Sequence, residues 1–205
     1  MDPLSEDILE FWFGDTDTAR DMERRDVWFR STPEFDGDID RRYRAIQERA
    51  GGGAFDHFIG DPGDCLALVL MLDQFPRNLF RGSPRAFATD AKAREVARMA
   101  LDHGHDRGMG RWHRLFFYLP FEHSEHLADQ DRACALYEDV GDERALAAAY
   151  GHRDAIRRFG RFPHRNAALG RVNTPEEEVY LEDPPLWGKT AAEVAEIERR
   201  KAEAE

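Results

Sequence analysis

The sequence has few cysteines and no long hydrophobic run. Cys65 and Cys134 are its only cysteines. Each lies among apolar residues at helical spacing, which predicts reduced core thiols in a reducing compartment, with a disulfide between them as the less favoured alternative. The longest apolar run, residues 65–72, is much shorter than the roughly 20 residues that cross a bilayer, and residues 1–10 are acidic, unlike a signal peptide. We therefore expect a cytoplasmic protein without a membrane partner.

Basic residues are scarce relative to acidic ones. The chain has 29 Lys and Arg against 41 Asp and Glu, a formal net charge of -12. Such a charge repels phosphate backbones and anionic lipid, so no nucleic-acid partner is expected. The hydrophobic fraction of 41% indicates a chain that folds, because disordered chains lack the apolar groups that offset chain entropy.

Common catalytic sequence signatures are missing too. The chain has no Gly-x-x-x-x-Gly-Lys-Ser/Thr phosphate loop, no Gly-x-Gly-x-x-Gly dinucleotide motif, no Gly-x-Ser-x-Gly elbow and no Cys-x-x-Cys pair. We therefore predict no cofactor, and no reaction follows from the sequence.

Strand signals are absent, whereas helical spacing of apolar residues is nearly continuous. Capping residues precede proline at Asp61-Pro62, Ser83-Pro84 and Thr174-Pro175. We predict an all-α fold built from antiparallel helix pairs, with a single domain over residues 1–183 and a polar, partly helical tail over residues 184–205.

Some helix bounds can also be predicted. Ser5 and Ser124 are the expected N-caps of two helices. Pro76 and Pro120 are expected to end the helices that precede them, because proline lacks the N–H that an interior position donates. The tail is expected either to be marginally stable or to dock only through Val194 and Ile197.

The first polar cluster reads FEHSEH. Glu122, Glu125 and His126 are three and four residues apart, so in a helix they would converge on one point, where carboxylate and imidazole suit a divalent metal. No second Glu-x-x-His motif completes such a site, although His113 or His152 could do so in space. The favoured interpretation places the carboxylates at a helix N-terminus, paired with arginines.

The second polar cluster interrupts the most apolar helix. Asp73, Gln74, Arg77 and Asn78 lie beside that helix, where polar groups are costly unless each has a partner. These four side chains could orient a small ligand, or they could fix the helix end and the loop that follows. Both interpretations stay open.

The third cluster is rich in arginine. Guanidinium groups make bidentate contacts with carboxylates or phosphates, so this stretch is either an anion site or half of an internal salt-bridge network. We favour the network, because Asp73, Glu122 and Glu125 are available as partners. Its cationic and imidazole residues are Arg153, Arg157, Arg158, Arg161, Arg165 and Arg171 with His152 and His164.

Several motifs in the same order resemble a known family. LDQFPRN occupies residues 72–78, RAFATD residues 85–90, PFEHSE residues 120–125 and RFGRFPHRNAALGR residues 158–171. The chain resembles the bacterial domain-of-unknown-function family number nine hundred twenty-four over roughly residues 5–182. The resemblance implies an all-α, tetratricopeptide-like right-handed superhelix and no established activity. The polar positions that match the family pattern are Asp73, Gln74, Arg77, Asn78, Glu122, His123, Glu125, Arg161, His164, Arg165 and Asn166.

Two functional hypotheses follow. The leading one is a binding or scaffold domain in which those matching polar positions line or brace a groove for a small acidic ligand or a peptide. The alternative is a metal-assisted hydrolase or oxidase that uses the Glu and His residues at positions 122–126. The sequence leaves open whether the protein is an enzyme.

Overall fold

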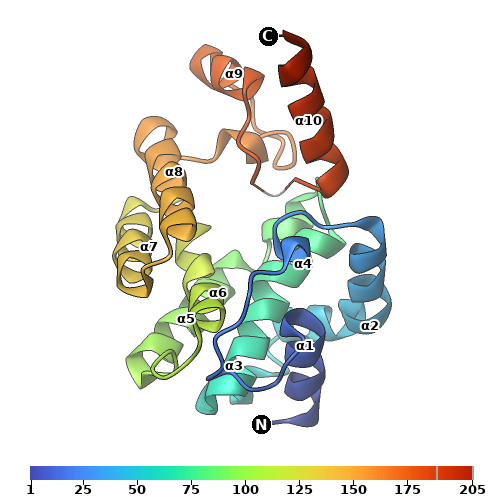
Figure 1. Ribbon diagram of the computed structural model, residues 1–205, viewed down its shortest axis with the longest axis vertical. Coiled ribbons are helices and arrows are strands. Elements are labelled where there is room, and N and C mark those ends of the chain that lie inside the picture. The colour runs from blue at the N-terminus through green and yellow to red at the C-terminus, as the bar shows by residue number, and fades with distance from the viewer. Residues whose placement is uncertain (188, 205) are drawn as a thin grey trace.

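The regular elements of the protein are helices. The computed structural model describes residues 1–187 and 189–204, and apart from an isolated bridge between Ser31 and Thr190 these residues contain no strand. The predicted all-α fold is confirmed, while the superhelical arrangement stays a prediction. The longer helices, labelled in Figure 1, are α1 (Pro3–Phe13), α2 (Pro33–Gly51), α3 (Pro62–Val69), α4 (Phe75–Leu79), α5 (Asp90–His103), α6 (Arg111–Glu122), α7 (Leu127–Val140), α8 (Glu143–Phe159), α9 (Pro175–Glu182) and α10 (Ala191–Ala204).

Short helical turns connect these elements. Most are 3-10 turns, and η3 is a π-helical segment between α3 and α4. They are η1 (Asp26–Trp28), η2 (Asp56–Gly60), η3 (Leu70–Gln74), η4 (Pro84–Phe87) and η5 (Pro163–Arg165).

Several helices begin where the sequence predicts. The Asp61 carboxylate accepts from the first free N–H groups of α3, and Thr174 forms a reciprocal capping box with Glu177 at the start of α9. The prediction for Ser5 was wrong, because Asp2 caps α1 and Ser5 is buried inside it. The prediction for Ser124 was wrong as well, since His126 occupies the N-cap of α7 and Ser124 lies in the preceding turn.

Neither proline ends its helix. Pro76 lies within α4, which continues from η3, and Pro120 lies inside α6 before its end at Glu122. Proline removes one N–H, but the helix continues when another donor reaches the carbonyl that is left over or when tertiary packing outweighs the loss.

The core is centred on α3, η3 and α6. The side chains from Cys65 to Leu72 are buried, and aromatic rings from α1, α2 and α6 surround this segment. Trp12 contacts Phe75 at a centroid distance of 5.8 Å and Phe116 at 5.6 Å. Both cysteines are free and buried, as predicted.

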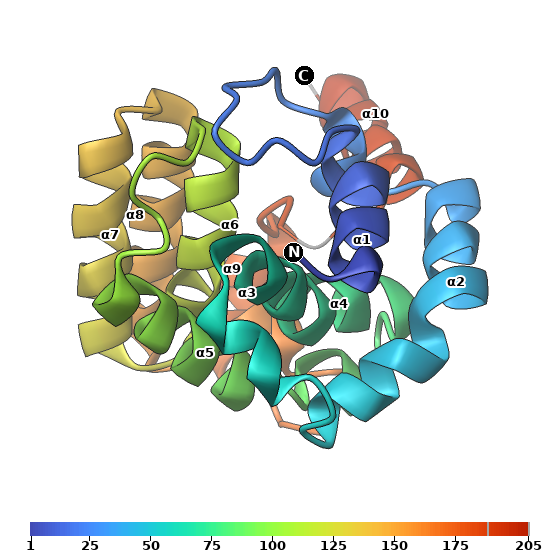
Figure 2. The same ribbon diagram turned by 90° about the horizontal axis from the view of Figure 1, so that it is seen from below.

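The elements form two flanks around this centre. Figure 2 shows α6, α7 and α8 side by side on one flank and α1 and α2 on the other, with α3 and α4 between them. Contacts join α6 to α7 and α7 to α8 along their lengths. None of the helices in the described ranges is both long enough and apolar enough to cross a membrane.

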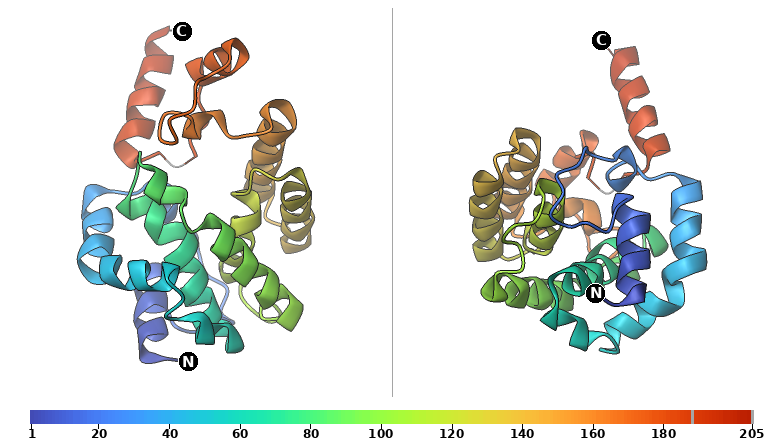
Figure 3. Two further views of the ribbon diagram at one scale, coloured as in Figure 1. Left: turned by 180° about the vertical axis from the view of Figure 1, so that it is seen from behind. Right: turned by 60° about the horizontal axis from the view of Figure 1, so that its bottom comes forward.

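The part of the chain that follows α9, which we call the C-terminal segment, returns to the body of the molecule before α10 projects from it (Figure 3). The N–H of Ala191 donates to the carbonyl of Ser31 at 3.0 Å, and Val194 is 2% exposed. Docking through Val194 agrees with the sequence, and Ile197 is partly buried. The prediction that the tail docks through these two residues alone was wrong, because Trp187 stacks on His152 and Glu198 pairs with Arg30. The division into a domain and a tail stays a prediction.

Candidate functional site

A fully buried carboxylate, Asp73, lies in the π-helical segment η3. The helix widens there, because the N–H of Phe75 donates to the carbonyl of Leu70, five residues earlier. Insertions of this kind within α-helices are frequent at functional sites, since they re-aim side chains away from the regular helical positions.

Side chains satisfy the backbone carbonyls that this irregular segment exposes. Pro76 has no N–H to donate to the carbonyl of Leu72, and the Thr89 hydroxyl donates to that oxygen at 2.5 Å. The carbonyl of Asp73 accepts from Nη1 of Arg77, also at 2.5 Å. The side chains of Arg77, within α4, and Thr89, before α5, therefore stabilise the widened helix.

The Asp73 carboxylate is the hub of a buried polar cluster. It accepts from Nε2 of Gln74 at 2.6 Å and from Nδ1 of His123 at 2.9 Å, and its Oδ1 lies 3.2 Å from Nη1 of Arg77. Burial alone would raise the pKa of Asp73, but the charge of Arg77 and the hydrogen bond from His123 outweigh burial and hold that pKa well below its usual range. The carboxylate is therefore ionised at neutral pH.

Two arginines converge on Asp90, at the start of α5. Arg77 makes a bidentate contact with it at 2.9 and 3.0 Å, and Nη1 of Arg165 lies 3.5 Å from Oδ2. The Arg165 guanidinium also lies over the rings of Phe87 and Phe162, at 4.6 and 4.5 Å. Burial lowers the pKa of Arg165 to about 10, so it stays charged at neutral pH.

A second carboxylate and imidazole pair lies beside the first. Nδ1 of His152 is 2.9 Å from Oε1 of Glu122 and 2.9 Å from the carbonyl of Ala148. Burial opposes ionisation of Glu122, yet His152 and the hydroxyl of Tyr137 bring its pKa below the ordinary value. The ring centroids of His123 and His152 are 6.3 Å apart.

Both pairs border the main cavity of the molecule, about 670 Å³ in volume, which we call the central cavity. Its walls come from α4, α6, α8, the loop before α2 and the C-terminal segment. Aromatic side chains of Trp28, Phe29, Trp112 and Phe116 form part of them. The ionisable and imidazole side chains that line it are Glu23, Arg24, Arg30, Arg77, Arg81, Arg111, Glu122, His123, Tyr137, Asp142, Glu143, Arg144, His152 and Lys189.

The three polar motifs meet through direct contacts. Nδ1 of His123 contacts Asp73, and the carbonyl of His123 accepts from Nη2 of Arg165 at 3.0 Å. Glu125 accepts from the N–H of Phe162 at 2.9 Å. Of the positions chosen from the sequence, Gln74, Arg77, Asn78, Glu122 and His123 line the central cavity.

None of the remaining chosen positions is among the residues that line the central cavity, and several of them connect the segments that follow α8. Arg161 makes a bidentate contact with Glu177 at 2.6 and 2.7 Å, and Nδ2 of Asn166 reaches the same carboxylate at 3.3 Å. Glu125 pairs with Arg171 at 2.8 and 2.9 Å. His164 lies near the ring of Trp187.

The arginine-rich stretch is paired with carboxylates, as the favoured interpretation required, but its partners differ in part from those expected. Glu125 binds Arg171, whereas Asp73 contacts Arg77 and His123. The other carboxylates that pair with this stretch are Asp90, Asp131, Glu176 and Glu177. Sequence spacing cannot identify such partners, since they come from distant elements.

Glu122, Glu125 and His126 do not form the metal site considered as an alternative. The segment crosses a helix junction, because α6 ends at Glu122 and α7 begins at Leu127. Glu122 turns to His152 and Glu125 to Arg171. In residues 1–187 and 189–204, no group of three or more His, Cys, Asp or Glu side chains is placed to hold a metal ion.

Sequence reasoning missed several cavity residues. Nothing in the local pattern marked the aromatic wall, Tyr137, Arg144 or Lys189 as cavity residues. Asp90 could have been found, because it ends the RAFATD motif and is an acidic residue at the start of a helix.

Comparisons with known proteins identify relatives. The family described as "Bacterial protein of unknown function (DUF924)" matches residues 8–185. A solved structure of a protein of unknown function from Agrobacterium tumefaciens is 42% identical, with a TM-score of 0.81, over 88% of this chain and 98% of that one. No functionally curated protein matches the chain.

Proposed function

This chain belongs to the DUF924 family of bacterial proteins of unknown function, and we propose that it binds a small organic anion in the central cavity. The observation that carries the proposal is the charge of the lining. Arg24, Arg30, Arg77, Arg81, Arg111, Arg144 and Lys189 outnumber Glu23, Glu122, Asp142 and Glu143. Most of these cations are paired with carboxylates, but Arg144 and Lys189 form no ion pair in the described ranges, so a protein with a net charge of -12 presents unpaired cations inside a concavity, which attract anions.

The volume of the central cavity and its apolar wall favour an organic ligand over a simple ion. Ligand cavities span about 300–1,000 Å³ and combine apolar walls with a few polar groups that fix orientation, and the volume here is about 670 Å³. The rings of Trp28 and Trp112 lie 5.2 Å apart and provide a surface for a planar or apolar portion.

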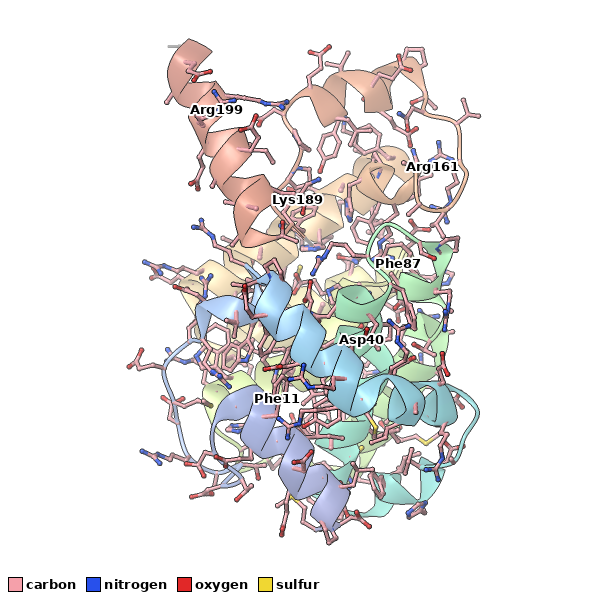
Figure 4. The ribbon with its side chains drawn as sticks, turned by 90° about the vertical axis from the view of Figure 1, so that its right-hand side faces the viewer. Phe11, Asp40, Phe87, Arg161, Lys189 and Arg199 are labelled. Atoms are coloured by element: carbon pink, nitrogen blue, oxygen red, sulfur yellow. The ribbon has the colours of Figure 1, made fainter. Side chains whose placement is uncertain are left out.

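Two of the cations are available for a ligand. Arg77 is already paired with Asp73 and Asp90. Neither Arg144 nor Lys189 forms an ion pair with any residue in the described ranges. Figure 4 shows Lys189 where the C-terminal segment meets the body of the molecule.

Calorimetric titration with aromatic carboxylates, phenyl phosphate and mononucleotides tests the proposal, with short peptides as a separate arm. The double variant Arg144→Gln/Lys189→Gln should bind the best anion about 100-fold more weakly or worse, because each of the two charge-assisted hydrogen bonds contributes about 1.5–3 kcal/mol. The control Arg98→Gln removes an exposed arginine of α5 and should leave affinity unchanged. Equal affinity in the double variant, or no binding by the unaltered protein, would refute the proposal.

A further inference from the structure

His123 and His152 are oriented alike at the edge of the central cavity. In each, Nδ1 lies 2.9 Å from a buried carboxylate oxygen, of Asp73 and of Glu122 respectively. An acceptor at Nδ1, which is Asp73 for His123 and the Ala148 carbonyl together with Glu122 for His152, fixes the proton on that nitrogen. The other ring nitrogen, Nε2, is then the one that can exchange a proton with a ligand.

Both rings reach the same space. Each residue lines the central cavity, and the two ring centroids are 6.3 Å apart. In the described part of the chain, no hydrogen bond involves Nε2 of either ring, and neither Nε2 atom is sealed from solvent. Two imidazoles at this separation can contact opposite sides of one small reacting group.

The two pairs differ in how their negative charge is balanced. Asp73 lies between His123 and the guanidinium of Arg77, so its charge is balanced while the imidazole stays neutral. Burial lowers the pKa of His123 below its ordinary value, and the charge of Arg77 lowers it further. Neutral His123 can accept a proton.

Glu122 has a different environment. It is 4% exposed, and within residues 1–187 and 189–204 it pairs with no Lys or Arg. The imidazole of His152 faces it, with Nδ1 2.9 Å from Oε1, and Tyr137 contributes to lowering its pKa. The carboxylate behind His123 has Arg77 beside it, whereas the carboxylate behind His152 has no guanidinium or ammonium partner in the described residues, and this difference assigns the role of proton donor to His152.

We propose that His123 and His152 are the general base and general acid of a hydrolase that acts on a small phosphodiester in the central cavity. The inference rests on the anion binding proposed above. Asp73 and Glu122 are positioning residues, because they act through the imidazoles.

The reaction balances without a redox partner. Nε2 of His123 takes a proton from water, and the water oxygen forms a bond to phosphorus as the bond from phosphorus to the ester oxygen breaks. Nε2 of His152 gives its proton to the departing alkoxide, so that the products are a phosphate monoester and an alcohol. Exchange of one proton with solvent then returns His123 to its neutral form and His152 to its protonated form.

The lining favours phosphoryl over acyl transfer. An acyl oxyanion is stabilised by neutral N–H donors, but the nearby amides of Gln74 and Asn78 already donate to Asp73 and Asp36, at 2.6 and 2.7 Å. Cationic groups match the charge that a phosphoryl group spreads over its oxygens, and Arg144 and Lys189, which form no ion pair in the described ranges, line the same cavity.

The test compares two diesters that differ in their leaving group. Bis(4-nitrophenyl) phosphate releases a stable phenolate, whereas a 3′,5′-cyclic mononucleotide releases an alkoxide that needs a proton. His123→Gln should lower kcat for both by about 100-fold or more, the usual range for a general base. His152→Gln should lower kcat strongly for the cyclic nucleotide and only slightly for the nitrophenyl diester.

Controls separate loss of the site from loss of the fold. His126→Gln replaces an exposed histidine close by in the sequence and should leave both rates unchanged. Each variant is also titrated with phenyl phosphate, and retained binding shows that the cavity is intact.

Failure of the catalytic inference is distinguishable from failure of the proposed binding. If the unaltered protein binds phenyl phosphate but hydrolyses neither diester, the catalytic inference is overturned and anion binding stands. Equal loss of both activities in His152→Gln would overturn the assignment of the acid. If no anion binds, both proposals fail.

Discussion

Single buried polar residues in this protein differ in how completely their partners satisfy them. Asp73 has an amide, an imidazole and a guanidinium around it, and it stays charged. Nδ1 of His164 is buried with no hydrogen-bond partner in the described residues. Since an unpaired buried imidazole is easier to bury neutral than charged, acid should affect the two residues differently.

His164 is expected to make stability sensitive to mild acid. Burial, and then the charge of Arg165, lowers its pKa from 6.5 to about 3. In mild acid the unfolded chain therefore binds a proton at His164 that the folded chain does not. The contribution of the neutral His164 side chain to folding stability is thus complete above pH 6.5 and is lost as pH falls toward 3. Between pH 6.5 and about 5, where carboxylates do not yet titrate, His164→Phe should lose less stability than the unaltered protein.

Thermal unfolding at a series of pH values measures this effect. The quantity to compare is the change in Tm with pH, because His164→Phe can alter stability at neutral pH through packing alone. His126→Gln serves as the control, since that residue is exposed. Parallel Tm curves for His164→Phe and the unaltered protein would contradict the expected linkage.

At the scale of elements, the join between α3 and α4 depends on a side chain from another helix. Pro76 leaves the carbonyl of Leu72 without its usual donor, and the hydroxyl of Thr89 takes that place. Thr89 precedes α5 and makes no capping hydrogen bond there. Its hydroxyl therefore acts on a distant element instead of on its own helix.

Replacing Thr89 by Val should destabilise the fold by about 1–3 kcal/mol, because a buried carbonyl loses its donor. In a Pro76→Ala background the new N–H can supply a donor, so the same replacement should cost less. A double-mutant cycle in urea measures the difference as a coupling energy. Thr89→Ser keeps the hydroxyl and should be nearly neutral; additive effects of Pro76→Ala and Thr89→Val would argue against the compensation.

At the scale of the whole molecule, the C-terminal segment completes the central cavity. Leu186, Trp187, Lys189 and Val194 line it, although the family match ends at residue 185. The ring of Trp187 stacks on His152 at 3.7 Å. Gly151 permits this approach, since a Cβ at that position would lie 2.9 Å from Cζ2 of Trp187.

Gly151→Ala should displace Trp187 while strengthening α8, because alanine is favoured over glycine in a helix interior by about 1 kcal/mol. Collisional quenching of tryptophan fluorescence by acrylamide should then increase. Trp187 should account for the increase, because the other three tryptophans, Trp12, Trp28 and Trp112, are buried at 0%, 7% and 6% exposure. Asp154→Ala, at an exposed position of α8, is the matched control. Unchanged quenching in Gly151→Ala would show that the helix or the ring accommodates the methyl group in place.

The displaced Trp187 should also change access to the cavity. Release of a bound anion, followed by stopped-flow fluorescence, should be faster in Gly151→Ala than in the unaltered protein, because one wall of the cavity has moved. Asp154→Ala should leave the release rate unchanged. Equal rates in all three proteins would mean that the segment does not restrict the ligand.

The sequence alone determined the helical class, the reduced cysteines and the starts of α3, η4 and α9. These features depend on local chemistry, namely apolar spacing, capping side chains such as Asp61 and Thr174, and the fixed φ of proline. It also selected the motif residues around Asp73 and His123, because polar groups beside an apolar helix need partners.

Only the tertiary structure decided who those partners are. It joined Asp73 to His123 and Glu122 to His152, and it assembled the central cavity from elements as distant as η1 and the C-terminal segment. It also showed that the helices continue through Pro76 and Pro120. Local pattern cannot specify such features, because pairing between distant side chains depends on how the helices pack and not on the spacing within any one of them.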